Sequence, residues 1–228
     1  MKRRLPILAA LAAAALTGAG CGSSSSSSSS NAGSASTTAT AAAGAPGASP
    51  SAGKPGFEGV PIEAGPEIAP ANTTGTNDVD GITCGATEQL AYHIHSHLQI
   101  YVNGQPRALP GGIGIPGSTV QPSSQAGPVA AGGQCIYWLH THAPDGVIHV
   151  ESPTARIYTL GNFFDEWHQP LTASRIGNAA GTITAYVNGK AWKGDPRLIQ
   201  LKPHAVIQLD AGQPAVPFRA MSWSGLQL

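Results

Sequence analysis

Six of the eight histidines in this 228-residue chain occur in two short stretches of alternating polarity. The first stretch contains His93, His95 and His97, and the second contains His140, His142 and His149. Both stretches predict β-strands, in which histidines two apart point the same way with Cβ atoms roughly 6.5–7 Å apart. Imidazoles at that spacing can converge on one ion, and imidazole suits zinc, copper, nickel and iron. The sequence therefore predicts a metal site on a β scaffold.

The spacing also limits which histidines can share an ion. His93 and His97 are two pleats apart, roughly 13 Å, which is too far for ligands that each bind at about 2.0–2.1 Å. We therefore expect a site with two neighbours from the first triplet and one or two histidines from the second stretch. The remaining histidines would form a second site, shuttle protons or orient ligands. His168 and His204 are expected to be ordinary polar positions.

Three polar residues are candidates for supporting roles near the histidines: Gln99, Asp145 and Glu151. Gln99 and Glu151 are predicted to orient ligands from outside the metal's own coordination shell. If the site is catalytic, Glu151 or Asp145 is the candidate general base. Three neutral imidazoles with an open fourth position are typical of catalytic zinc, whereas a closed shell of four ligands is typical of a structural ion.

The pairing register of the second stretch decides whether its histidines meet. If residues 143–146 form a four-residue loop, His140 lies directly across from His149 and shares a face with it. A type I turn followed by a bulge would slip the pairing by one residue and send His149 to the other face. Only the first register places Val150 on the same side as Leu139, so we favour it.

The remaining elements predict a mainly β fold, a small sandwich or barrel with one short helix at about 160–168. Apolar residues recur in that helix at i, i+3, i+4 and i+7, with Thr159 as N-cap and Pro170 as end stop. Asn103-Gly104 and Asn188-Gly189 each predict a hairpin and hint at two related β-lobes. Pro110–Gly133 is rich in glycine, proline and serine and predicts a long surface loop. Further strands are expected at 134–142, 147–152, 156–159, 197–201 and 204–210.

The N-terminus predicts an export signal. Residues 1–20 combine a basic start, an apolar stretch and small residues before Cys21. This order resembles the signal of bacterial lipoproteins, in which the cysteine is lipidated and anchors the protein to the outer face of the cell membrane. Gly18 departs from that pattern, which prefers leucine there, so plain secretion is the alternative.

The composition divides the rest of the chain in two. Residues 21–76 are rich in serine, alanine, glycine and proline and predict a disordered tether. Residues 77–228 predict one β-rich, histidine-containing domain. The chain has 12 basic and 12 acidic residues, and three of the basic ones lie in the signal segment. The exported part is therefore mildly acidic, and nucleic acid is an unexpected partner.

Cysteine usage agrees with export. With Cys21 assigned to the anchor, Cys84 and Cys135 remain as an even pair in an oxidising compartment. A disulfide between them would hold the start of the second histidine strand close to the approach to the first. The alternative is two unpaired thiols.

The histidine motifs resemble those of a family of exported bacterial and archaeal proteins without an established activity. The matching motifs are His93 to Ile100, Val102 to Gly104, Leu139 to His142, and Gly146 to Ser152. The downstream stretches Thr159 to Phe164 and Tyr186 to Gly189 also fit, and the likeness spans most of residues 82–210. The resemblance implies that the histidines form a site but names no reaction.

Three hypotheses of function follow from these observations. The first is a lipid-anchored extracytoplasmic domain that binds a divalent transition metal, zinc or copper, for sequestration, delivery or sensing. The second is a metal-dependent enzyme whose open imidazole site activates water or dioxygen. The third is a surface interaction domain with a pH-sensitive histidine patch.

Overall fold

The computed structural model describes residues 53–71, 75–122, 127–226 and 228. Within them the chain is mainly β, with one α-helix, several sheets and no closed barrel. The predicted fold class, a small mainly β fold with one short helix, is therefore confirmed, and of its two variants the barrel is not found among these residues. The predicted signal peptide and the lipidation site Cys21 lie outside the described residues. The described part of the chain contains no candidate membrane-spanning helix.

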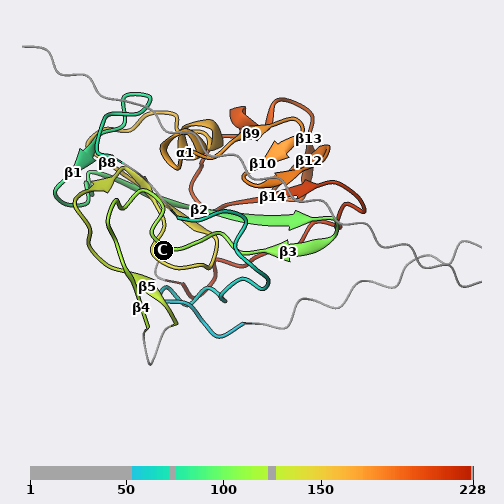
Figure 1. The fold of residues 1–228 in the computed structure, drawn as a ribbon, viewed down its shortest axis with the longest axis horizontal. Helices are drawn as coiled ribbons and strands as arrows, with labels where there is room; N and C mark the ends of the chain where they lie inside the picture. The colour runs from blue at the N-terminus through green and yellow to red at the C-terminus, as the bar shows by residue number, and fades with distance from the viewer. Residues whose placement is uncertain (1–52, 72–74, 123–126, 227) are drawn as a thin grey trace, which may run out of the picture. The chain divides into compact units, whose positions relative to one another are not determined.

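A seven-stranded sheet forms the centre of the fold, with β2 in its interior (Figure 1). Its strand order is β13-β12-β14-β2-β8-β7, and β3 pairs with one part of β2. These strands are β2 (Tyr92–Val102), β3 (Gln105–Arg107), β7 (Leu139–His140), β8 (Val147–Ser152), β12 (Ile183–Val187), β13 (Lys190–Trp192) and β14 (Ala205–Ala211). The β14–β2 pair is parallel and the other pairs of this sheet are antiparallel.

Three small sheets accompany the central one. They are formed by β1 (Cys84–Gly85) with β6 (Ile136–Tyr137), β4 (Val120–Gln121) with β5 (Val129–Ala130), and β9 (Leu171–Thr172), β10 (Arg175–Ile176) and β11 (Ala179–Ala180). The Cys84–Cys135 disulfide lies beside the first pair and confirms the predicted bond. It joins the segment before β2 to the segment that leads into β7.

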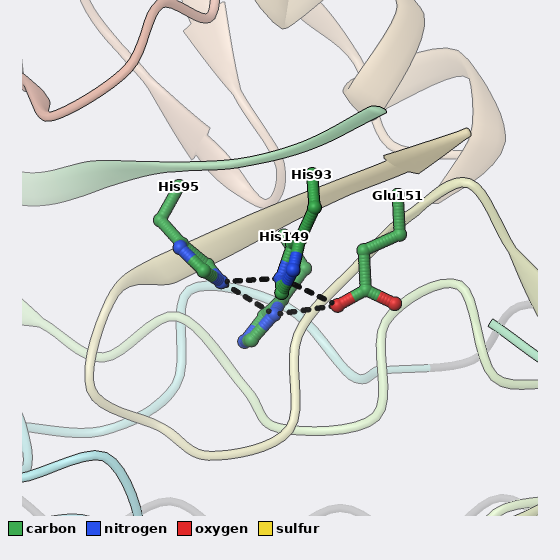
Figure 2. Close-up of side chains that lie close together, drawn as sticks. All are labelled: His93, His95, His149 and Glu151. Carbon is green, nitrogen blue, oxygen red and sulfur yellow. Dashed lines mark hydrogen bonds and ion pairs between the residues drawn. The ribbon is translucent and has the colours of Figure 1, made fainter. Parts of the chain in front are cut away.

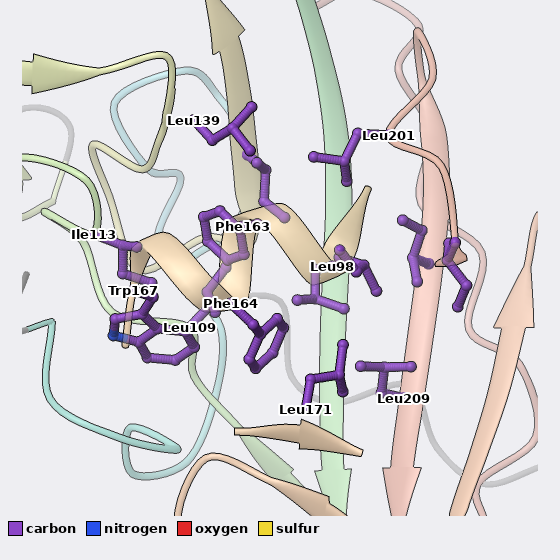
Figure 3. Packing of buried hydrophobic residues seen from close by; sticks show 14 of the residues in the cluster. Leu98, Leu109, Ile113, Leu139, Phe163, Phe164, Trp167, Leu171, Leu201 and Leu209 are labelled. Carbon is purple, nitrogen blue, oxygen red and sulfur yellow. The ribbon is translucent and has the colours of Figure 1, made fainter. Parts of the chain in front are cut away.

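Alternation along β2 and β8 separates an apolar face from a histidine face. Leu98 and Ile100 of β2 and Ile148 and Val150 of β8 belong to the hydrophobic core. The helix α1 (Leu160–Glu166) packs on this face through its aromatic residues, and Figure 3 shows Phe163 with the core leucines around it. The histidines at 93, 95 and 149 occupy the alternate positions and therefore lie on the opposite face.

The helix begins and ends close to where its pattern predicts. Thr159 is the N-cap, and its hydroxyl accepts a hydrogen bond from the backbone N–H of Asn162. The Asn162 side chain in turn accepts from the N–H of Thr159, which completes a capping box. The helix ends at Glu166, two residues short of the predicted boundary.

The two Asn-Gly hairpins form as predicted but belong to one sheet, not to two lobes. Asn103 and Gly104 both have positive φ, as do Asn188 and Gly189, which is the backbone of a type I′ turn. They join β2 to β3 and β12 to β13, and these two hairpins flank β14.

Three expectations about the connecting segments are wrong. The first part of the loop at 110–133 is buried, because the backbone of 112–114 hydrogen-bonds to residues 137–141. The stretch 156–159 makes only an isolated bridge, from Thr159 to Gln200. The stretch 197–201 overlaps the 3₁₀-helix Pro196–Leu198 because Asp195 caps that helix and proline occupies its first position.

The folded part begins earlier than the predicted boundary at residue 77. Val60 and Ile68 are buried, and the N–H of Glu63 donates to the Pro144 carbonyl. The indole N–H of Trp167 likewise donates to the carbonyl of Pro70. Residues 53–71 therefore pack on the β domain, although the expected tether included them, because their scattered apolar residues carry no periodic pattern.

Candidate metal centre

Three histidines lie in a row across three adjacent strands. His95 of β2 is the Cα partner of His149 of β8, and His149 is the Cα partner of His140 of β7. The ring centroids are 4.6 Å apart for the first pair and 5.0 Å for the second. The predicted register of the second stretch is thus confirmed, and it makes His149 the middle imidazole of the row.

The turn before β8 supports this register. Gly146 has a φ of 80°, a conformation that side-chain-bearing residues rarely adopt. A Cβ added there would lie 2.6 Å from the Leu98 carbonyl oxygen. Only glycine therefore lets the chain turn so close to β2 and enter β8 with His149 on the histidine face.

Four donor atoms converge at the β2 side of the row, and we call them the primary group. Figure 2 shows the side chains of His93, His95, His149 and Glu151 pointing toward one another. His93 Nε2 lies 3.0 Å from His95 Nε2, which lies 3.2 Å from His149 Nδ1. Glu151 Oε1 closes the ring at 3.3 Å from His149 Nδ1 and 3.1 Å from His93 Nε2.

These separations are those expected of ligands around one transition-metal ion. Ligands bound tetrahedrally at about 2.0–2.1 Å lie about 3.3–3.4 Å apart, and adjacent square-planar ligands about 2.8–3.0 Å apart. The four neighbour distances of the primary group, 3.0–3.3 Å, fall between these two geometries. Three imidazole nitrogens and one carboxylate oxygen also suit zinc and copper as donor types.

A second set of donors lies at the β7 side of the row, and we call it the secondary group. We define it as Glu88, His140, His142 and the second oxygen of Glu151, which combines parts of two sets of mutually close donors. His140 Nε2 is 3.9 Å from Glu151 Oε2, and His142 Nε2 is 3.3 Å from Glu88 Oε1. His140 joins two sets of mutually close donors, one with Glu88 and Glu151 and one with His142 and His149.

In both histidines of the secondary group, the Nδ1 atom is hydrogen-bonded to a backbone carbonyl, which leaves Nε2 for the ion. His140 Nδ1 donates to the Tyr137 carbonyl at 2.9 Å, and His142 Nδ1 donates to the Ala130 carbonyl at 3.0 Å. With the proton on Nδ1, each Nε2 carries the free lone pair. Such an outer hydrogen bond is the usual arrangement of a metal-binding histidine.

Glu58 gives His149 an equivalent outer partner. Its Oε1 lies 2.7 Å from His149 Nε2, on the side of the ring away from the primary group. The arrangement is that of a carboxylate–histidine–metal triad, in which the carboxylate orients the ring and raises its basicity. Sequence reasoning missed Glu58, which lies in the segment expected to be disordered. It also missed Glu88, which precedes the histidine strand without any distinguishing pattern.

Four residues of the centre are buried, whereas His93 and Glu88 are exposed. The exposed fractions are 0% for His140, 3% for Glu151, 4% for His149 and 5% for His95. Burial and the neighbouring imidazoles lower the pKa of His95 to about 3 and the pKa of His140 well below its ordinary value. Both rings are therefore neutral at neutral pH, which is the form that binds metal.

His149 behaves differently because two carboxylates face it. Burial by itself lowers its pKa, but the contacts with Glu151 and Glu58 outweigh that effect and raise the pKa to about 9. Without a metal, a proton on His149 supplies the positive charge between the two carboxylates. A metal ion in the primary group would take over that role at Nδ1.

One predicted ligand and two predicted supporting residues lie elsewhere. His97 Nε2 donates to the Asp145 carbonyl at 2.9 Å, and His97 belongs to neither group, because it is one pleat beyond His95.

The Gln99 amide donates to the Arg219 carbonyl, so Gln99 supports no ligand. Asp145 is buried, and burial together with the charge of Glu58 raises its pKa to about 7. Glu151 is a member of both groups, not an outer partner.

A cavity of about 850 Å³ opens onto the centre. Its polar wall contains Glu58, Glu88, His93, His95, His142, His149 and Glu151. The lining also includes the apolar residues Phe57, Val129, Ile136 and Leu226. Four of the six histidines, His95, His97, His140 and His149, are buried, which argues against a solvated surface patch and for a site that is reached through this opening.

The site and its scaffold define a class of protein: a mainly β domain with a buried cluster of histidines and glutamates that could hold a metal ion. Comparison of the chain with protein-family models, curated proteins and solved structures finds no match. The resemblance to exported histidine-motif proteins therefore stays a prediction.

Proposed function

We propose that the chain binds a divalent transition-metal ion, zinc or copper, in the primary group and sequesters, delivers or senses it. The observation that supports this proposal is the ring of four donor atoms with neighbour distances of 3.0–3.3 Å. Without an ion, each of the two nitrogen–nitrogen contacts needs one nitrogen that carries a proton and one nitrogen that does not. An ion replaces these shared protons and satisfies all four donors together.

A binding role fits this group better than a catalytic one. The primary group offers four protein donors, which is the number of a closed shell, whereas catalytic zinc keeps one position open. Both oxygens of Glu151 face imidazole nitrogens, so Glu151 is better placed as a ligand than as a general base. Asp145 is buried and does not line the cavity, which removes it as a base.

The proposed location is the outer face of a bacterial cell membrane, with an anchor on Cys21. Support comes from the signal-like residues 1–20 and from the Cys84–Cys135 disulfide, since such bonds persist in oxidising compartments outside the cytoplasm. The membrane is then the partner of the anchor, and nucleic acid is not expected as a partner.

Calorimetric titration tests the proposal. The full chain, purified in detergent without a polyhistidine tag, is stripped with chelator and titrated with Zn²⁺ and with Cu²⁺ at neutral pH. We expect binding tighter than micromolar for at least one of them, and its loss in His95→Ala. The control is His168→Asn, which removes an exposed imidazole while asparagine tolerates the positive φ of 57° at that position. No binding tighter than micromolar for either ion would refute the proposal.

The cavity favours one second candidate, a metal-dependent enzyme. A cavity of about 850 Å³ beside the donors leaves room for a small substrate. An enzyme requires an exchangeable position on the bound ion. Azide added to the Co²⁺-loaded or Cu²⁺-loaded protein would then shift the visible spectrum, and an unchanged spectrum would exclude this candidate.

A further inference from the structure

We infer that the centre holds two metal ions at once, bridged by the carboxylate of Glu151. The inference rests on the proposed function, since it adds a second ion to the first. The two oxygens of Glu151 diverge: Oε1 faces His93 and His149, and Oε2 faces His140. A carboxylate between two ligand sets is the usual bridge of two-metal sites, whose ions lie about 3.5–4 Å apart.

Two buried atoms of the secondary group have no hydrogen-bond partner among the described residues. They are His140 Nε2 and Glu151 Oε2, and they belong to residues that are 0% and 3% exposed. The 3.9 Å between them is too long for a hydrogen bond. It is within the about 4.0–4.4 Å that can separate two ligands each about 2.0–2.2 Å from one ion, at a wide ligand–metal–ligand angle. A cation between them satisfies both atoms, which the primary ion cannot do.

The geometry selects Glu151 as the bridge over His149. A bridging imidazole must present both nitrogens to metal ions, but His149 Nε2 faces Glu58 Oε1 at 2.7 Å, in an ion pair that lacks hydrogen-bond geometry. His149 therefore serves the primary ion through Nδ1. The secondary ion takes His140 Nε2 and Glu151 Oε2, with Glu88 completing this set of mutually close donors. His142 Nε2, next to Glu88 Oε1, adds a further donor.

The charge of the centre also matches two ions. Three carboxylates, Glu58, Glu88 and Glu151, contact its histidines. With neutral imidazoles their formal charge is minus three, so one divalent ion leaves the centre anionic. A second divalent ion brings it to plus one, which a bound hydroxide or another anion from the open cavity can neutralise. Glu88, whose side chain is 36% exposed, lines the cavity, so the proposed secondary ion lies beside it.

Copper titration followed by electron paramagnetic resonance tests this inference on the full chain. Stripped protein receives stepwise Cu²⁺, and bound copper is counted after desalting. We expect two equivalents per chain, with the signal of isolated Cu²⁺ rising to the first equivalent and falling toward the second. The fall results from magnetic coupling between ions held a few ångströms apart.

Variants assign each ion to its ligands. His140→Ala should retain one equivalent with an undiminished isolated signal, because the primary group stays intact. Glu88→Gln, which alters an exposed side chain and leaves the core unchanged, should bind the second equivalent at least tenfold more weakly. His168→Asn should keep both ions and their coupling. Circular dichroism confirms that each variant folds.

The possible outcomes separate the two proposals. One tightly bound equivalent in the unaltered chain, with no second binding event, would overturn the two-ion centre and leave the proposed function standing. Two equivalents with fully uncoupled signals would overturn the bridge. No bound copper or zinc would overturn both proposals.

Discussion

His140 and His149 face each other directly across β7 and β8, with ring planes only 9° apart. Because neighbouring strands lie about 4.7–4.9 Å apart, this pairing brings histidines that are nine positions apart in the sequence into contact. His95 of β2 pairs with His149 from the other side. The position of β8 relative to its two neighbours, β2 and β7, therefore assembles both groups. A slip of one residue would turn His149 into the core and divide the centre.

Metal binding should stabilise the fold. An ion that binds the native state at 100 times its dissociation constant adds about 2.7 kcal/mol to the free energy of unfolding. Thermal unfolding of chelator-stripped protein should therefore shift upward by several degrees when Zn²⁺ or Cu²⁺ is added, and excess EDTA should reverse the shift. An unfolding temperature that does not respond to either ion would show that the centre stays empty in solution.

His149→Ala and His97→Gln should differ sharply in metal affinity, although both replace a buried strand histidine. His149 is the middle imidazole of the centre, so its loss should weaken binding by more than the roughly 10–100-fold typical of an outer partner. His97 contacts the Asp145 carbonyl and belongs to neither group, so its replacement should change the affinity less than about threefold. Competition with a chromophoric chelator measures both affinities. Equal losses would mean that His97 acts on the ion.

Glu58→Gln should weaken the primary ion without removing it. The carboxylate pairs with His149 Nε2 at 2.7 Å and orients the ring for binding through Nδ1. Loss of such an outer carboxylate typically lowers metal affinity 10–100-fold. The same chelator competition provides the measurement, with Glu67→Gln as a control, because Glu67 lies in the same segment but outside both groups. Unchanged affinity would exclude the triad.

Replacing both Cys84 and Cys135 by serine should lower the free energy of unfolding by about 2–4 kcal/mol. The bond closes a sequence separation of 51 residues and holds β1 beside β6, directly before the second histidine stretch. Urea unfolding with and without reductant checks this effect. Reductant should destabilise the unaltered chain and leave the double variant unchanged, and equal stability of the two chains would show that the bond contributes little.

Glu166→Gln should stabilise the protein above neutral pH. Burial raises the pKa of Glu166 well above its ordinary value, against a smaller lowering by the backbone of Leu139. A folded-state pKa above the unfolded one means that the native state favours the neutral acid, so stability falls as pH rises above the unfolded value of about 4.5. Glutamine avoids this ionisation.

The pH profile of the two chains supplies the check. At pH 8 the variant should be more stable by roughly 1–3 kcal/mol, the typical penalty for a poorly satisfied buried group. At pH 4 the difference should nearly vanish, because the unaltered carboxyl is then protonated in both states. A variant that is less stable at pH 8 would show that the ionised carboxylate has an essential partner in the core.

Local patterns predicted the scaffold well. The apolar stripe and Thr159 predicted the helix, two Asn-Gly pairs predicted the hairpins, and apolar alternation selected the register of His140 with His149. Each of these features depends on interactions within a few residues of the chain or across one turn. The periodicity of side chains on strands and helices reports such interactions directly.

The composition of the centre depended on contacts that no local pattern records. Glu58 reaches His149 across 91 positions of sequence, from a segment whose composition resembles a tether. His97 shares the face and spacing of His93 and His95, yet its ring bonds to a backbone carbonyl beyond the centre. Periodicity specifies the face on which a side chain lies, but the packing of distant segments decides which atoms meet there. Histidines on a β scaffold could be read from the residue order, whereas the four-donor ring and the divergent oxygens of Glu151 arose from folding.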